Sequence, residues 1–194
     1  VQVVEERTVG PTLGRDSIDR SVRAGWIAVA MVATLITAYY GLAGLIASVA
    51  LGVYAIAVLA VFTLIGATLT LPGIAGFILS LGMAVDGNVI TFEKMKEELR
   101  AGRTLRAAIQ AGWRRAVATI VDSNATTLIG AVVLLWLGTG PIRGFAVTLT
   151  IGVLVSMFSA IFMTRWLVEL CADWGLGGRI SRMAHLPQAA EAVA

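Results

Sequence analysis

Five long runs of apolar residues, separated by short polar or glycine-rich segments, make up most of this chain. A helix that crosses a membrane needs roughly 20 mostly apolar residues, and each run has that length or gains it from a few flanking residues. The pattern therefore predicts an all-α integral membrane protein with five transmembrane helices. The expected spans are 25–40, 42–65, 72–92, 120–137 and 142–170.

Proline and glycine residues mark where these helices should begin and end. Pro72 and Pro141 stand where the first turn of a helix tolerates a missing backbone N–H. Gly41 and Gly44 indicate a tight turn between the first two spans, and the segment 138–140 (GTG) separates the fourth span from the fifth. We therefore expect short connections at both points.

The polar stretch between the third and fourth spans predicts one further helix, over about residues 97–118. Gly102 is typical of a helix end and Thr104 of the next N-cap. Apolar residues then recur at every third or fourth position, which indicates an amphipathic helix. We expect this helix to lie along the cytoplasmic surface of the membrane. The apolar positions are Leu105, Ile109, Trp113, Ala116 and Ile120.

Composition supports the membrane assignment and excludes several other classes. The 194 residues are 58% hydrophobic and only 14% charged, whereas soluble domains are about 45–50% apolar and about 25% charged. The single cysteine, Cys171, excludes an intrachain disulfide framework. The basic pI of about 9.5 comes from cations clustered in one loop, which membrane topology explains better than a nucleic-acid partner.

Lysine and arginine predict the orientation of the chain. Ten of the fifteen lie on the side reached by the ends of the third and fifth spans, and five lie on the other side. The richer side is cytoplasmic by the positive-inside rule, so residue 1 is expected outside and residue 194 inside. We expect an extracytoplasmic end and linker over 1–20, the five-helix domain over 21–170 and a cytoplasmic tail over 171–194. A further helix and an extracytoplasmic domain before residue 1 would restore six spans.

Asp86 is the candidate functional residue, because it is an acid inside the third span. It lies eight residues before Lys94, hence roughly 12 Å inside that interface. A carboxylate there costs about 2.5–3.5 kcal/mol, and such acids usually face a bundle interior and mark proton or ion paths. Desolvation favours the neutral acid, which suits proton loading and release. The alternative is a protonated carboxyl that a neighbouring helix satisfies.

Other polar residues are candidates for the same path or for helix contact. By helical spacing, Asn88 lies off the Asp86 face and could contact a different neighbour. At the cytoplasmic start of the fourth span, Asn124 and Thr127 could bond the Asp86 helix, or the threonine hydroxyls could bond their own backbone. A solvated or capping role is favoured for Asp122. The candidate companions are Asn88, Asp122, Asn124, Thr126 and Thr127.

Small residues at intervals of four predict a helix-packing seam in the fifth span, at Gly152, Ser156 and Ala160. No nucleophile–base pair, phosphate-binding loop or metal-ligand spacing stands out in the sequence. We therefore expect a protein that is not an enzyme and that uses no cofactor or metal ion.

Four segments in order, 9–14, 69–99, 122–130 and 138–165, resemble the SecD members of the SecD/SecF family, within the resistance–nodulation–division superfamily. The resemblance implies five helices of a six-helix half, in a multi-pass protein of the bacterial inner membrane. It assigns Asp86 to proton movement and implies the partners SecF, SecYEG, an exported preprotein and, as a further candidate, YajC. The family often has alanine at the position of Gly87, so we expect slightly looser packing there.

Three other interpretations stay open at this point. One is half of a proton-driven exporter for small molecules or lipids, whose fourth helix also carries acids. Another is a non-conducting scaffold subunit in which Asp86 only packs. An intramembrane aspartyl protease would need a second acid facing Asp86, and Asp122 is the one candidate at comparable depth.

Overall fold

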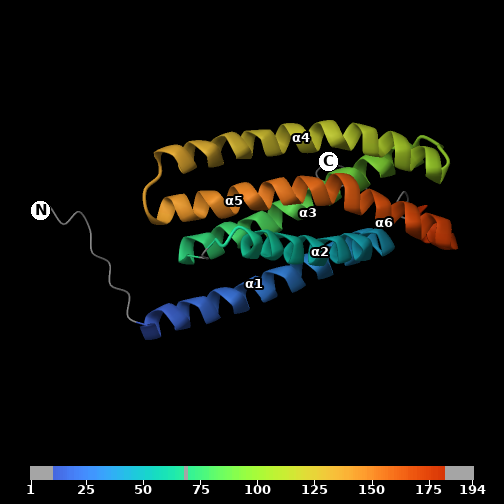
Figure 1. Cartoon of the computed structure of the whole chain (residues 1–194). Coiled ribbons are helices and arrows are strands. Elements are labelled where there is room, and N and C mark those ends of the chain that lie inside the picture. The colour runs from blue at the N-terminus through green and yellow to red at the C-terminus, as the bar shows by residue number, and fades with distance from the viewer. Residues whose placement is uncertain (1–10, 68–69, 182–194) are drawn as a thin grey trace, which may run out of the picture.

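The computed structural model describes residues 11–67 and 70–181. Residues 1–10 of the predicted segment 1–20 and residues 182–194 of the predicted tail 171–194 lie outside the described residues. Within the described part the chain is helical apart from short turns, and its long helices run back and forth side by side (Figure 1). Five helical segments are long and apolar enough to cross a membrane, which confirms the predicted spans.

Three helices extend well beyond the predicted spans, at the start of the first, the end of the third and the start of the fourth. The fifth span contains a π-helix, η1, that joins α5 to α6. The elements are α1 (Pro11–Tyr40), α2 (Leu42–Leu64), α3 (Leu71–Arg100), α4 (Leu105–Leu137), α5 (Pro141–Phe158), η1 (Ser159–Met163), α6 (Thr164–Cys171), η2 (Ala172–Leu176) and α7 (Gly177–Ser181).

The helix boundaries follow the proline and glycine pattern. Gly41 and Gly102 have φ angles of 60° and 81°, a left-handed backbone that glycine adopts without steric cost. Pro141 opens α5, as predicted, and α3 has a proline in its first turn. Thr70, whose capping role the sequence analysis missed, accepts a hydrogen bond from Gly73 N at 3.2 Å.

The separate amphipathic helix predicted over about 97–118 does not exist as an element of its own. Residues 97–100 end α3, and residues 105–118 are the first half of α4, continuous with the fourth span. The predicted apolar stripe is real, because Ile109, Ala116 and Ile120 are buried. It packs on the last turns of α3 rather than on lipid: a Cβ on Gly112 would stand 2.7 Å from the backbone N of Met95. Periodicity alone cannot distinguish these two apolar partners.

The helices α3 and α4 are longer than the hydrocarbon core of a membrane is thick. Their 30 and 33 residues correspond to about 45 and 50 Å, against a hydrocarbon core of about 30 Å. Near the start of the chain, residues 11–20 form the first turns of α1. The sequence analysis had predicted an end segment and linker over 1–20. The first residues of the predicted tail, up to 181, are helical, and Ile180 is buried in the main core.

The α3 helix is the centre of the bundle and packs against α1, α2, α4 and α5. Small residues let it approach α5 closely, as the predicted seam requires: Gly152 faces Ser80, and Ser80 accepts a 2.7 Å hydrogen bond from the hydroxyl of Tyr54 in α2. By contrast, α1 lies at the edge of the bundle in Figure 1 and exposes large apolar side chains such as Trp26 and Met31.

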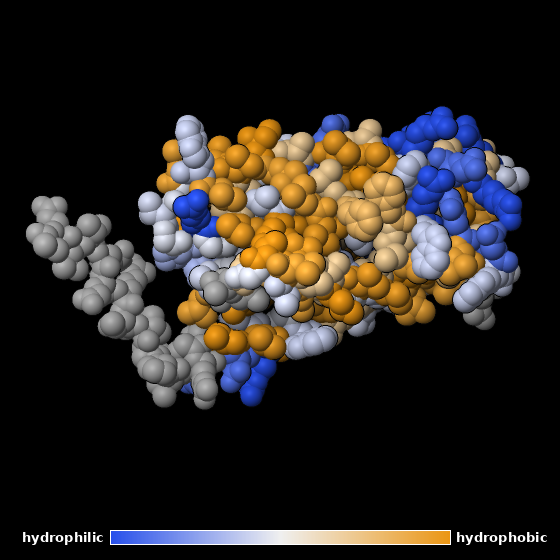
Figure 2. All heavy atoms as spheres, viewed as in Figure 1, coloured by the Kyte–Doolittle hydropathy of each residue, from blue (hydrophilic) through white to orange (hydrophobic). Residues whose placement is uncertain are grey.

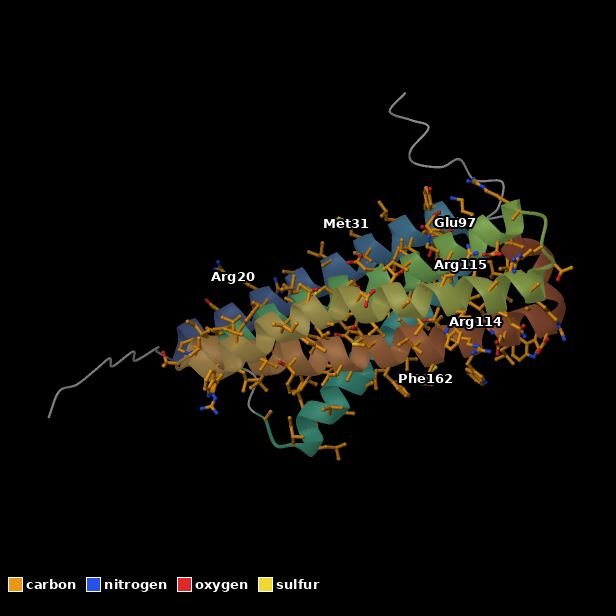
Figure 3. All side chains as sticks on the ribbon, turned by 90° about the horizontal axis from the view of Figure 1, so that it is seen from above. Arg20, Met31, Glu97, Arg114, Arg115 and Phe162 are labelled. Atoms are coloured by element: carbon orange, nitrogen blue, oxygen red, sulfur yellow. The ribbon has the colours of Figure 1, made fainter. Side chains whose placement is uncertain are left out.

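The face of the molecule seen in Figure 2 is a broad apolar zone with polar groups toward its two ends. Figure 3 places Arg20 toward one end and Glu97, Arg114 and Arg115 toward the other. This is the distribution expected of a protein whose middle lies in lipid and whose ends lie in water.

A buried carboxylate joins the α3–α4 hairpin at its polar end. The side chain of Glu98 is only 4% exposed, and its two oxygens accept bonds from Arg103 Nε at 2.8 Å and from Arg115 Nη1 at 2.9 Å. Arg103 lies in the connection and Arg115 in α4. One side chain on α3 therefore fixes both the turn and the helix that follows it.

Replacing Glu98 with Gln should destabilise the protein by about 2 kcal/mol, because hydrogen bonds to charged groups contribute about that much. The control is Glu97→Gln, whose i,i+3 pair with Lys94 is partly exposed and contributes about 0.2–0.5 kcal/mol. The measurement is the midpoint of thermal unfolding of the full protein in detergent micelles. Equal midpoints for the two variants would show that the buried carboxylate does not stabilise the hairpin.

Candidate functional site

Asp86 lies on the exposed side of α3, within the apolar zone. No hydrogen bond or ion pair joins its carboxylate to another described residue. Its neighbours along the same strip, Leu79 and Gly82, are also exposed, and a Cβ added at Gly82 would meet nothing within 4 Å. The strip of Leu79, Gly82 and Asp86 is therefore left uncovered by the rest of the described chain.

The strip is bordered on one side by α1 and on the other by α4, which Figure 3 shows on either side of α3. Ile78 lies against Gly25 of α1. Met83, on the opposite border, packs against a buried cluster that includes Ala131 of α4. At 100° per residue, Asp86 points between these two borders. Asp86 therefore lies on a strip of α3 that has α1 on one side and α4 on the other.

The polar run on α4 does not reach Asp86. Asn124 Nδ2 donates to the carbonyl of Ile120 at 2.8 Å, and the Thr126 hydroxyl donates to the carbonyl of Asp122 at 3.3 Å. Thr127 likewise donates to its own helix, four residues back, at 3.5 Å. These side chains therefore bond the backbone of their own helix, and not the helix that carries Asp86. Asp122 is exposed, and no hydrogen bond joins its carboxyl group to that of Asp86 as a pair of acids would require.

Asn88 lies off the Asp86 face, as its spacing predicted, and contacts the fifth span. Its side chain is 2% exposed, and its Oδ1 accepts a 2.6 Å hydrogen bond from the hydroxyl of Thr164. Thr164 is fully buried at the start of α6. The bond ties the segment of α3 that carries Asp86 to the lower part of the fifth span.

Thr164 follows the π-helix η1, which the sequence analysis did not foresee. The backbone N–H of Thr164 donates to the carbonyl of Ser159, five residues back, and this i→i+5 spacing defines a π-helix. The indole Nε1–H of Trp113 in α4 donates to the carbonyl of Ile161 within this turn at 2.9 Å. The Arg165 guanidinium lies over the Trp113 ring, 4.2 Å from its centroid. Three helices therefore meet at η1.

Gly87, between Asp86 and Asn88, does not loosen the packing, which corrects the sequence-based expectation. A Cβ at Gly87 would stand 2.7 Å from the Cβ of Ala160, closer than carbon atoms pack without displacement. Ala160 is itself 2% exposed and belongs to the predicted seam. Glycine is therefore the residue that allows α3 and the fifth span to approach at this level.

A buried lysine is the second feature that the sequence analysis missed. Lys96 is 1% exposed, and its Nζ lies 3.3 Å from Glu93 Oε1 and 5.3 Å from the centre of the Tyr39 ring. The hydroxyl of Tyr40 donates to the same oxygen of Glu93 at 2.8 Å. This group fastens the end of α1 to α3. The i,i+3 spacing of Glu93 and Lys96 was the available signal.

The described residues contain no group of three or more His, Cys, Asp or Glu side chains that could hold a metal ion. Asp86 supplies a single carboxyl group, which can bind and release a proton. It lies on a thin helix face where no described residue supplies a counter-charge.

Comparison with known proteins agrees with this architecture. Residues 1–174 match the family described as "Protein export membrane protein SecD/SecF, C-terminal". The chain is 54% identical over 168 residues to the protein translocase subunit SecD of Synechocystis and 55% identical over 168 residues to that of Acidaminococcus fermentans. These alignments cover 87% of this chain but only 36% and 40% of the two relatives, so the chain spans well under half of their length.

A solved structure is also similar. The crystal structure of SecDF, a translocon-associated membrane protein from Thermus thermophilus, matches with a TM-score of 0.85 at 50% sequence identity. The match covers 87% of this chain and 24% of that one.

Gly87→Ala should destabilise the protein by about 1–3 kcal/mol, the usual cost of overpacking. Adding Ala160→Gly should recover most of that loss, since it removes the atom that the new methyl meets. The measurement is a double-mutant comparison of unfolding midpoints for the parent, both single variants and the double variant. If the two losses simply add, the two positions do not contact each other as described.

Proposed function

The chain belongs to the SecD/SecF family of protein export membrane proteins, and on that premise we propose that it couples the proton-motive force to the export of preproteins through the SecYEG channel. The relatives from Synechocystis and Acidaminococcus fermentans are named as translocase subunits. Because the chain spans 36–40% of their length, binding and pulling of the exported polypeptide are assigned to an extracytoplasmic domain outside the chain described here.

The observation that carries this proposal is the position of Asp86. An acid on an uncovered helix face inside a span costs about 2.5–3.5 kcal/mol if it meets lipid. Nothing else in the described chain uses this carboxylate for packing, which argues against the scaffold interpretation. A second protein that covers the face would remove the lipid contact and could supply the counter-charge.

SecF is the partner that we propose for the strip of Leu79, Gly82 and Asp86. The strip presents little side-chain bulk at Gly82, so a helix of the partner could approach closely, as small residues permit in membranes. SecYEG and, as a further candidate, YajC would associate with the assembled complex. Asn88, Asp122, Asn124, Thr126 and Thr127 are then packing or water-ordering residues rather than direct partners of the acid.

We place the protein in the bacterial inner membrane, with the polar end that carries Arg114 and Arg115 in the cytoplasm. The supporting observation is the distribution of charges between the two ends in Figure 3. It agrees with the positive-inside rule applied to the sequence.

Asp86→Asn should abolish the stimulation of preprotein export by the proton-motive force while leaving assembly with SecF intact. The amide has the same shape but cannot release a proton at neutral pH. The measurement is export in inverted membrane vesicles with and without an imposed proton gradient, using the full-length subunit together with SecF.

The matched control is Asp122→Asn, which makes the same chemical change at an exposed position of α4. It should leave the stimulation unchanged. Full stimulation in the Asp86→Asn vesicles would refute the proton-coupling role. Loss of the complex with SecF in that variant would instead support a scaffold role for the residue.

A further inference from the structure

Two neighbouring residues anchor α3 against the fifth span next to Asp86. Gly87 lies against Ala160, close enough to exclude even a methyl group. Asn88 accepts the 2.6 Å hydrogen bond from Thr164. The first contact sets the distance between the helices. The second is directional, because a hydrogen bond between two fixed side chains tolerates little rotation.

Helix geometry relates this anchor to the direction of Asp86. Successive residues of an α-helix turn by roughly 100°, so residues two apart point in nearly opposite directions. Asn88 faces the buried seam with a side chain that is 2% exposed. Asp86 is therefore directed to the uncovered face whenever Asn88 is bonded to Thr164. The same rotation of α3 that broke this bond would turn the acid away from that face.

The π-helix η1 is what brings Thr164 to Asn88. A π-turn contains one extra residue, which rotates everything after it by roughly 100° relative to a continuous α-helix. Without that turn the Thr164 hydroxyl would point away from α3. The π-turn interrupts the regular hydrogen bonds of the α-helix and leaves backbone groups that need other partners. The carbonyl of Ile161 accepts a hydrogen bond from Trp113 Nε1–H. The geometry of the bond thus depends on a side chain from α4.

We propose that Asn88 and Thr164 are positioning residues for Asp86, with the π-turn at 159–163 holding Thr164 in place. Their hydrogen bond fixes the rotation of α3 that presents the acid to the partner face. This inference rests on the proposed function of Asp86 in proton movement, but it concerns the orientation of the side chain. Orientation can be measured without export.

The test uses N,N′-dicyclohexylcarbodiimide, which reacts with carboxyl groups in apolar surroundings, in membrane vesicles that carry the full-length subunit. Thr164→Val keeps the shape of the side chain and removes the hydroxyl, so α3 loses its rotational anchor. We expect the rate of Asp86 labelling at one fixed pH to fall several-fold. Thr164→Ser retains a hydroxyl and should label at the parent rate. Asp86→Asn defines the background.

The matched control is Thr150→Val, because the Thr150 hydroxyl donates only to the carbonyl of Ala146 in its own helix, at 2.8 Å. It should label at the parent rate. If Thr164→Val does not accumulate, Thr164→Ala removes the same hydroxyl without adding a methyl group, and the same fall is expected.

Labelling at the parent rate in the variant without the hydroxyl overturns the positioning role, whatever happens to export. A fall that Thr150→Val shares overturns it too, since the effect would then be general to the helix. If labelling falls as expected while Asp86→Asn vesicles still respond fully to the proton gradient, the positioning role stands and the proposed function fails. The two proposals therefore fail separately.

Discussion

The close approach of α3 to the fifth span is the constraint on which the rest of the structure depends. Between helices in lipid there is little hydrophobic driving force, so association relies on van der Waals contact and on hydrogen bonds between side chains. Gly87 against Ala160 and Gly152 against Ser80 allow the two backbones to meet. That approach in turn makes the buried hydrogen bonds of Ser80 and Asn88 possible. It also commits one side of α3 to the core and leaves the other side for Asp86.

How far the sequence predicted this arrangement depends on how local each feature is. The five spans, the turn at Gly41, the proline that opens α5 and the small-residue seam follow from hydropathy, from single-residue conformational preferences and from spacing, and the structure has all of them. The stripe from Leu105 to Ile120 was recognised as amphipathic but assigned to the wrong apolar partner. Whether a stripe meets lipid or a neighbouring helix is decided by tertiary packing, which periodicity does not encode.

The candidate site divides in the same way. An acid at position 86 is conspicuous in a hydropathy pattern, and so it could be identified as the candidate residue directly. The π-turn could not be predicted from the sequence, because one extra residue in a helix of apolar residues leaves no mark on composition. Thr164 was consequently overlooked, and the threonines of α4 were considered instead, although those bond their own backbone. The buried Lys96 was counted only as a topological charge, because its burial depends on α1 returning to α3 through Tyr40.

Most of the cations at the polar end near Arg115 pair with a carboxylate of the described chain. Lys94, Lys96, Arg103, Arg106, Arg115 and Arg165 all have a carboxylate partner. Topology is governed by lysines and arginines with little contribution from acids, but attraction to anionic phospholipids depends on the surface potential. Five carboxylates serve these six cations, because Arg103 and Arg115 share Glu98, so the pairing weakens the positive potential of this end without removing it. The folded protein should still favour acidic lipids in the surrounding leaflet, but less strongly than its count of lysines and arginines suggests.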